Sequence, residues 1–271
     1  MFFWKIKSRT MYIDIISDSE AILQLVKACF DAHNEPDVPT ALLPSKRTIR
    51  IQEKAEGQYF VYKEGCVREC TSCEAVLGVV VDWLYNSLPT EEYFYLHGGA
   101  VSKNKTCIAL LAPSNMGKTT IVVDFLKRGY GYYSDDIIPI HKKNLTVCSF
   151  PKPLFLREDS PHIGNTQMRI KNGTYERQLF IPKAIEHLPQ PLTCIFLLNR
   201  DQQFLHHPHI ETLAGAEKIR SVLYNIYTVS NAQEAAICTM RLLRQTKVYR
   251  LNYFSSSEAI DCIEAWSFYE K

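Results

Sequence analysis

The sequence predicts an α/β fold in the larger, C-terminal part of the chain, preceded by a small α+β N-terminal region. The chain has 271 residues, of which 46% are hydrophobic and 22% charged, which is typical of a folded globular protein. Apolar segments of strand length alternate with amphipathic segments of helix length. One compact unit, residues 107–134, has the pattern strand, loop, helix, strand. We expect a boundary between an accessory region, 1–92, and a second domain, 93–271.

Composition excludes several classes of protein. Lysine and arginine number 31 against 29 acidic residues, a net charge of +2, which argues against a nucleic-acid-coating protein. Nine cysteines are an odd number in a chain too long to need disulfides, which indicates a reducing compartment. Lys5, Lys7 and Arg9 interrupt the apolar start, and no apolar run approaches the roughly 18 residues of a membrane span. We therefore expect a cytoplasmic protein that does not enter a membrane.

The N-terminal region has four predicted elements. A capping box at Ser17 and Glu20 predicts a helix over 18–33, and a second box at Thr71 and Glu74 predicts a helix to about residue 87. Between them, two strands at 49–51 and 59–62 are expected around a turn at Gly57. Pro89 ends this region.

The C-terminal region alternates strands and helices. Strands are predicted at 93–96, 107–111, up to 134, 137–140, 146–150, 193–198 and 248–251. Helices are predicted at 118–127, 213–226, 232–245 and from 256. The Pro-punctuated stretch 151–190 is expected to be irregular up to the strand at 193.

A phosphate-binding loop is predicted between the strand 107–111 and the helix 118–127. The segment reads Ala112-Pro113-Ser114-Asn115-Met116-Gly117-Lys118-Thr119-Thr120. In such a loop, backbone N–H groups and the helix N-terminus face the phosphates, the lysine reaches them, and the first hydroxyl ligates Mg²⁺. The usual first glycine is replaced by Ala112, and Asn115 stands where a small residue is frequent. Both are accepted as variants, because alanine is small and asparagine tolerates left-handed backbone geometry.

An acidic pair follows the loop closely. Asp135 and Asp136 come 17 and 18 residues after Lys118, at the end of the next predicted strand. Adjacent carboxylates can divide two roles, one holding Mg²⁺ and the other accepting a proton from an attacking hydroxyl. His97 ends the preceding strand, and we expect it to hydrogen-bond the catalytic carboxylate and tune it.

These motifs together resemble the C-terminal catalytic domain of HPr kinase/phosphorylase. The segments that carry the resemblance are LHGGAVS, LLAPSNMGKTT and RGYGYYSDDIIPI, within residues 93–150. The resemblance implies a P-loop nucleotide-binding domain with a mixed sheet that uses ATP and Mg²⁺. It assigns catalysis to His97, Lys118, Asp135 and Asp136, with Asp135 as the base and Thr119 and Asp136 at the metal. The nucleotide contacts implied are Ser114, Asn115, Met116, Gly117, Lys118, Thr119 and Thr120.

Two departures shape the functional hypothesis. The Glu-x-Arg-Gly-x-Gly signature of the bifunctional enzymes is absent after the catalytic core, and residues 1–90 do not resemble their regulatory domain. The loop spelling and chain length are similar to those of HPr-kinase-like proteins that phosphorylate a serine of lasso-peptide precursors. The resemblance therefore implies a kinase that phosphorylates a peptide or small protein on serine. The acceptor, the reverse reaction and the oligomeric state, a homo-oligomer included, stay open.

Alternatives remain at this stage. In the first alternative, the protein is an HPr-type serine kinase of carbon regulation. In the second, it is a non-catalytic protein that binds ATP and signals to a partner. A third is a metallocluster enzyme built on Cys66, Cys70 and Cys73. The segment 141–183 carries eight lysines and arginines against three acidic residues, so it is a source of phosphate or substrate contacts. The contacts expected from it are Lys152 and Arg157, the two basic residues nearest the core, together with Glu158.

Overall fold

The computed structural model describes residues 1–35, 37–39, 43, 46–55, 57–150, 152–158, 160–162, 168–172, 175–229 and 231–269. The chain divides into two compact units. The first contains residues 1–89 and 151–183, and the second contains 90–150 and 184–271. The N-terminal border lies close to the expected one. The segment 151–183, which was expected in the second domain, groups instead with the first unit.

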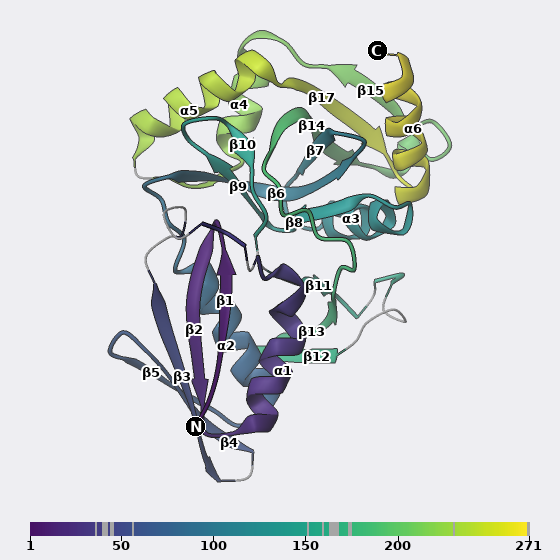
Figure 1. Ribbon diagram of the computed structural model, residues 1–271. Coiled ribbons are helices and arrows are strands. Elements are labelled where there is room, and N and C mark those ends of the chain that lie inside the picture. The colour runs from purple at the N-terminus through teal and green to yellow at the C-terminus, as the bar shows by residue number, and fades with distance from the viewer. Residues whose placement is uncertain are drawn as a thin grey trace. The chain divides into compact units, whose positions relative to one another are not determined.

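The first unit contains a five-stranded sheet with the order β1-β2-β3-β4-β5 among the described residues (Figure 1). Its strands are β1 (Phe2–Ser8), β2 (Met11–Ser17), β3 (Arg47–Ala55), β4 (Gln58–Lys63) and β5 (Cys66–Cys70), and its helices are α1 (Glu20–Phe30) and α2 (Cys73–Tyr85). Among the described strands of this sheet, β2 and β3 pair in parallel and the other neighbours pair antiparallel. Alternate residues such as Ile13, Ile15, Ile49 and Ile51 are buried, which is the period of two that a half-buried strand requires.

Both predicted helices of this unit exist, but their caps differ from the predicted boxes. α1 is preceded by Ser19, whose side chain makes no capping bond, and Ser17 Oγ accepts from Ser19 N instead. α2 is capped by Ser72, whose Oγ accepts from Ala75 N at 3.2 Å. Neighbouring serines and threonines compete for the same role, so a sequence pattern locates the cap only to within one or two residues.

The segment 151–183 contains three strands, although an irregular stretch was expected. β11 (Leu154–Leu156), β13 (Tyr175–Phe180) and β12 (Met168–Asn172) pair antiparallel in the order β11-β13-β12. Their order comes from pairing between segments distant in sequence, as between Leu154 and Phe180. Short strands of this kind carry little local signal, which explains the wrong prediction.

The second unit contains a mixed sheet in which, among the described residues, the main path runs β10-β9-β6-β7-β14-β17-β15 (Figure 1). The strands are β6 (Tyr93–Lys103), β7 (Thr106–Leu111), β8 (Gly131–Ser134), β9 (Ile137–His141), β10 (Thr146–Val147), β14 (Gln190–Arg200), β15 (His209–Thr212), β16 (Ile226–Thr228) and β17 (Lys247–Tyr253). The helices are α3 (Lys118–Lys127), α4 (Gly215–Tyr224), α5 (Ala232–Gln245) and α6 (Ser256–Tyr269). β7, β14 and β17 are parallel neighbours, so their carboxyl ends meet at one edge.

Two glycines explain why β6 is one long strand and does not end at Leu96 as expected. A β carbon on Gly98 would lie 2.6 Å from the backbone oxygen of Leu110, and one on Gly99 would lie 2.6 Å from Val122 Cγ2. Only glycine allows β6 to pass this close to β7 and α3. The Gly98-Gly99 pair therefore packs the strand against the phosphate loop's own strand and helix.

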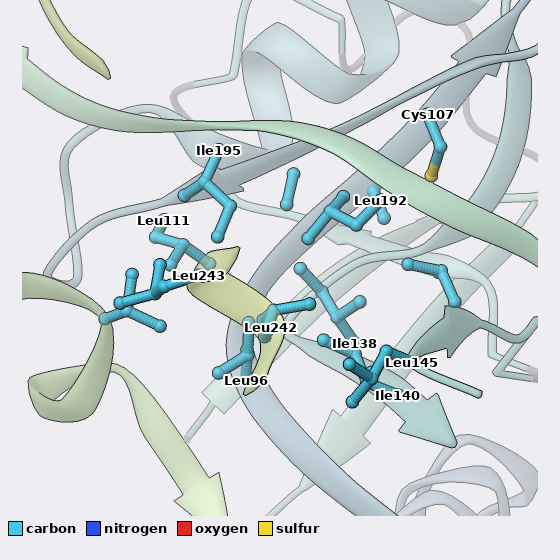
Figure 2. Packing of buried hydrophobic residues seen from close by; sticks show 14 of the residues in the cluster. Leu96, Cys107, Leu111, Ile138, Ile140, Leu145, Leu192, Ile195, Leu242 and Leu243 are labelled. Carbon is cyan, nitrogen blue, oxygen red and sulfur yellow. The ribbon is translucent and has the colours of Figure 1, made fainter. Parts of the chain in front are cut away.

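The hydrophobic core of the second unit lies between the sheet and α5. Figure 2 shows Leu242 and Leu243 of α5 directed toward strand residues that include Leu96, Leu111 and Ile195. All five are buried. α5 begins as predicted, because Asn231 Oδ1 accepts from Glu234 N at 2.9 Å.

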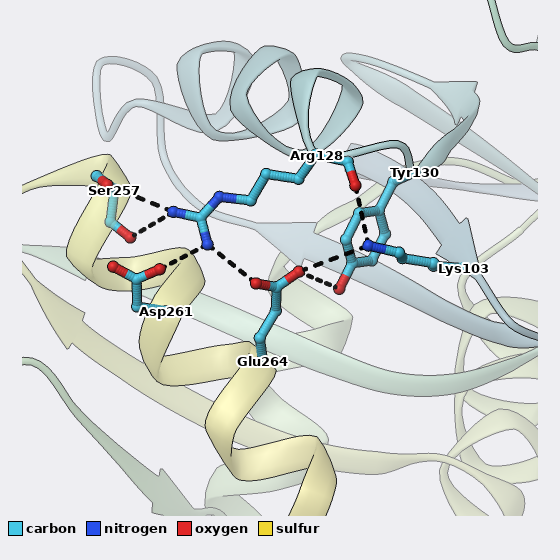
Figure 3. Close-up of polar contacts among 6 residues, drawn as sticks. All are labelled: Lys103, Arg128, Tyr130, Ser257, Asp261 and Glu264. Atoms are coloured by element: carbon cyan, nitrogen blue, oxygen red, sulfur yellow. Dashed lines mark hydrogen bonds and ion pairs between the residues drawn. The ribbon is translucent and has the colours of Figure 1, made fainter.

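An ion-pair cluster joins the end of α3 to α6 (Figure 3). Arg128 Nη1 lies 2.6 Å from Asp261 Oδ1 and 2.9 Å from Glu264 Oε2. Glu264 also accepts from Tyr130 Oη at 3.2 Å, and Lys103 Nζ donates to the Arg128 carbonyl at 2.9 Å. The helix that follows the phosphate loop is thus fastened at its far end to the last helix of the chain.

In the stretches for which the structure gives a placement, no helix combines the length and apolarity needed to cross a membrane.

The edge strands β15 and β16 were not predicted from the sequence. Both are short, at four and three residues.

Gly98→Ala should lower the free energy of unfolding by about 2 kcal/mol, because the new methyl group overlaps the Leu110 carbonyl. Urea denaturation measures this change. Gly65→Ala is the control, since a β carbon there meets nothing within 4 Å, although its φ of +81° adds about 1 kcal/mol of backbone strain. Equal losses in the two variants would contradict the close approach of β6 and β7.

Glu35 should make stability depend on pH. Its carboxylate lies 3.4 Å from Arg9 Nε, and burial raises its pKa from 4.5 to about 7 despite the opposing effect of Arg9. The folded state therefore holds a proton that the unfolded state has lost, so this contribution is complete below pH 4.5 and disappears as pH rises through 7. Relative to Glu35→Gln, the wild type should lose about 3 kcal/mol across this range. Parallel stability curves for the two proteins would contradict the assignment.

Candidate functional site

The loop between β7 and α3, residues 112–117, is the predicted phosphate loop, and two of its residues have left-handed backbone geometry. It leaves β7 at the buried Ala112 and enters α3 through Gly117, the N-cap residue, whose φ is +81°. Asn115 has a φ of +73°, a left-handed backbone conformation that asparagine tolerates, as expected from the sequence. Pro113, Ser114 and Asn115 are exposed. The loop therefore presents its backbone to solvent at the N-terminus of a ten-residue helix.

Lys118 is buried beneath this loop, with 7% of its surface exposed. Its Nζ donates to the carbonyl oxygens of Ala112 at 2.7 Å and Pro113 at 3.3 Å, and contacts His97 Nε2 at 3.2 Å. Burial lowers the pKa of Lys118, while Asp135 and Asp136 act in the opposite direction. The ammonium group is thus held inside the loop, where a bound phosphate would meet it.

His97 bridges the loop and the acidic pair. Its Nδ1 lies 3.0 Å from the backbone oxygen of Asp136, and because a carbonyl only accepts, Nδ1 carries the proton. Nε2 is then the acceptor for the Lys118 ammonium group. The expected bond from His97 to a carboxylate stays a prediction. His97 acts on Asp136 through its backbone and on the phosphate loop through Lys118.

The two carboxylates have different surroundings. Asp135 is 1% exposed, and its Oδ2 accepts from Thr119 Oγ1 at 3.0 Å. Asp136 is half-buried and has a φ of +69°, and its backbone oxygen accepts from Gly98 N at 3.1 Å. The first carboxylate therefore lies beside the hydroxyl expected to ligate a metal, and the second lies nearer to solvent. This arrangement favours the reverse of the assignment that the resemblance implied.

The oxygen atoms at this place suit Mg²⁺. The Thr119 hydroxyl and the Asp135 carboxylate are hard oxygen donors, and magnesium is usually held in proteins by one or two carboxylates together with substrate phosphates. The backbone cradle and Lys118 suit the phosphates themselves. The residues present therefore fit a magnesium–nucleotide substrate.

Tyr253 was missed by the sequence analysis. It ends β17, is 1% exposed, and its hydroxyl donates to the backbone oxygen of Met116 within the phosphate loop. The same hydroxyl would lie 3.2 Å from a β carbon on Gly117. The two residues of this bond are 137 positions apart, so no local pattern could reveal it.

Arg200 was also missed. It ends β14, the parallel neighbour of β7, and its Cδ would lie 4.0 Å from a β carbon on Gly117. Its Nε donates to the Phe254 carbonyl at 3.0 Å, and its guanidinium lies 5.2 Å from the centre of the Phe254 ring. A cation thus stands beside the phosphate loop. A polar residue at the end of a strand that neighbours the loop's strand was the available signal.

The predicted contacts in the basic segment belong to the first unit, whereas the site lies within the second. Lys152 is fully buried, with its Nζ 4.3 Å from the centre of the Phe155 ring and 5.4 Å from that of Tyr85. Arg157 and Glu158 are exposed. Their participation in the site stays a prediction.

The cysteine alternative is not supported. Cys66 and Cys70 occupy opposite ends of β5, which places them about 13 Å apart at the rise of an extended strand. Within the described ranges, no group of three or more His, Cys, Asp or Glu side chains is arranged to hold a metal ion. The spacing of the three cysteines does not bring them together, because an extended strand separates Cys66 from Cys70.

Comparisons with known proteins give similarities to solved structures but not to known sequences. No protein-family model matches the sequence, and no curated protein matches it. Among solved structures, the chain is similar to the "Hpr(Ser) kinase/phosphatase from Coxiella burnetii" with 11% identity and a TM-score of 0.38, over 65% of this chain and 97% of that one. This score is too low to assign a fold or a function. The functional proposal therefore rests on the geometry of the site.

Tyr253→Phe should weaken ATP binding about fivefold, because the phosphate loop loses one buried hydrogen bond at Met116. Titration calorimetry with ATP and Mg²⁺ measures the change. Tyr249→Phe is the matched control, since Tyr249 lies four residues earlier on the same strand and stacks on Phe196 with ring centres 5.3 Å apart. An unchanged affinity in Tyr253→Phe would show that the hydroxyl does not support the loop.

Proposed function

We propose that this protein is an ATP-dependent phosphotransferase that phosphorylates a serine of a peptide or small protein. The observation that carries the proposal is the convergence of a phosphate loop with two unlike carboxylates. The Thr119 hydroxyl, at the start of the loop's helix, bonds to the buried Asp135, while Asp136 is the more accessible carboxylate. A nucleotide-binding protein without catalysis would not need this second carboxylate, Asp136.

Each residue then has a role. The loop backbone and Lys118 bind the β- and γ-phosphates, and Thr119 and Asp135 hold the magnesium ion. That ion, when bound, neutralises negative charge on the phosphates. Asp136 accepts the proton of the serine hydroxyl. His97 is a positioning residue, because it fixes Lys118 and the Asp136 backbone.

The reaction is a direct displacement at phosphorus. The serine oxygen forms a bond to the γ-phosphorus, the bond from that phosphorus to the β–γ bridging oxygen breaks, and the electron pair leaves with ADP. The serine proton passes to Asp136. Arg200, at the end of the neighbouring strand, is close enough to the loop to neutralise phosphate charge. Most of the rate enhancement in such reactions comes from positioning and charge neutralisation.

The acceptor within this proposal is a peptide of the lasso-precursor type, phosphorylated on a serine such as its last residue. The support is the sequence of the phosphate loop, Ala-Pro-Ser-x-x-Gly-Lys-Thr. HPr protein is the competing acceptor. The absence of the Glu-x-Arg-Gly-x-Gly signature argues against a reverse, phosphorylase reaction.

Asp136→Asn and Asp135→Asn should fail in different ways. Asp136→Asn should reduce phosphate transfer about 10³-fold and leave the affinity for ATP with Mg²⁺ nearly unchanged, because only the proton acceptor is lost. Asp135→Asn should lose both transfer and the enhancement of ATP binding by Mg²⁺. Transfer from labelled ATP and calorimetry with and without Mg²⁺ measure the two quantities.

The acceptor panel contains synthetic peptides ending in serine and HPr protein. Label on a peptide supports the peptide-kinase assignment, whereas label on HPr alone places the protein with the carbon-regulation kinases. Exchanged phenotypes of the two Asp variants would restore Asp135 as the base. ATP binding by the wild type without transfer to any acceptor would contradict the kinase proposal and favour a nucleotide-gated binding protein.

A further inference from the structure

A short strand borders the candidate site on the side of His97. β16 pairs antiparallel with β6, with Ile226 opposite Leu96 and Thr228 opposite Tyr95. The register therefore advances two residues on β16 and one on β6, and Tyr227 is the extra residue of a β-bulge. Bulges redirect side chains and are frequent beside active sites.

The position of β16 is fixed by β6, the strand that carries His97. The backbone oxygen of Asn225 accepts from His97 N at 2.6 Å. Asn225 is held in turn by the end of α4, because its N donates to the Val222 carbonyl at 3.0 Å and its Nδ2 donates to the Ser221 carbonyl at 2.8 Å. Ile226 packs against the core. Tyr227 is thus carried by a backbone tied directly to His97.

Tyr227 is half-exposed, and its strand and the strand that follows Asp136 pair with opposite edges of β6. Its side chain is 47% exposed, which is high for a large aromatic residue beside a buried core. Burial, and after it the Asp136 carboxylate, raises the pKa of the Tyr227 hydroxyl, which places that carboxylate within electrostatic reach. Among the strands that the structure describes, β16 pairs with β6 alone. A half-exposed ring therefore lies beside the strand that carries His97, within electrostatic reach of the proposed base.

We propose that Tyr227 is the acceptor-binding residue, and that the acceptor is a peptide with an apolar side chain directly before its phosphorylated serine. The inference rests on the proposed function and adds a substrate preference to it. The apolar neighbour packs against the Tyr227 ring and holds the serine hydroxyl at Asp136. An acidic neighbour is disfavoured, because Asp136 is close to the same place.

The test compares three peptides that differ only in the residue before serine, which is leucine, glycine or aspartate. The wild type should use the leucine peptide with a kcat/KM about tenfold above that of the glycine peptide. Tyr227→Ala should raise the KM for the leucine peptide about tenfold with little change in kcat or in ATP affinity, and should abolish the preference. Tyr227→Phe should retain it, because the ring remains.

Tyr224→Ala is the matched control, since Tyr224 ends α4 three residues before Tyr227 and is 83% exposed. It should behave as the wild type. Thermal unfolding checks each variant, and Tyr227→Thr replaces Tyr227→Ala if the latter does not fold, because threonine suits a strand.

Two failures are distinguishable. If the wild type transfers phosphate but Tyr227→Ala keeps the wild-type KM and peptide preference, the acceptor role of Tyr227 is wrong and the kinase proposal stands. If the wild type binds ATP and phosphorylates no acceptor, the proposed function fails and this inference fails with it. A fall in kcat and melting temperature together, with the preference intact, would make Tyr227 a structural residue only.

Discussion

The buried ammonium group of Lys118 is the constraint around which the candidate site is organised. An unpaired charge with 7% exposure would be strongly destabilising, and three neighbouring parts of the fold supply compensating groups. The loop provides the Ala112 and Pro113 carbonyls, β6 provides His97, and the turn after β8 provides two carboxylates. These same groups are the ones that a phosphate-transfer site requires. Stability and function therefore depend on one set of contacts.

The fold brings those groups together through close backbone packing. Gly98 and Gly99 let β6 lie against β7 and α3, which places His97 beside Lys118. At the other side, β17 carries Tyr253 to the loop, and α6, which follows β17, is joined to the end of α3 by Arg128. The strand and helix at the end of the second unit thus hold the phosphate-loop helix near both of its ends. A disturbance of either contact is expected to affect the loop.

The parts of this site that follow from local sequence were predictable. The bounds of α3, the left-handed Asn115 and the acidic turn at Asp135 depend on residues next to one another. Tyr253, Arg200 and Asn225 were not found, because their contacts are made by strands that pair across long separations. The strand predicted at 93–96 stopped before the Gly98-Gly99 pair, although the observed strand β6 continues through it. The pair marks close approach inside a strand. The proposed exchange of roles between Asp135 and Asp136 rests on the bond from Thr119 to the first of them, which only the geometry reveals.

The central claim is that the loop around Lys118 binds the phosphates of ATP, and a nucleotide titration tests it most directly. Calorimetry of the wild type and of Lys118→Met should be done with ATP and with adenosine, both in the presence of Mg²⁺. The account predicts one ATP bound per chain, a loss of about 100-fold in ATP affinity in Lys118→Met, and equal, weak binding of adenosine by both proteins. Equal affinity of the two proteins for ATP, or no binding by the wild type, would contradict it.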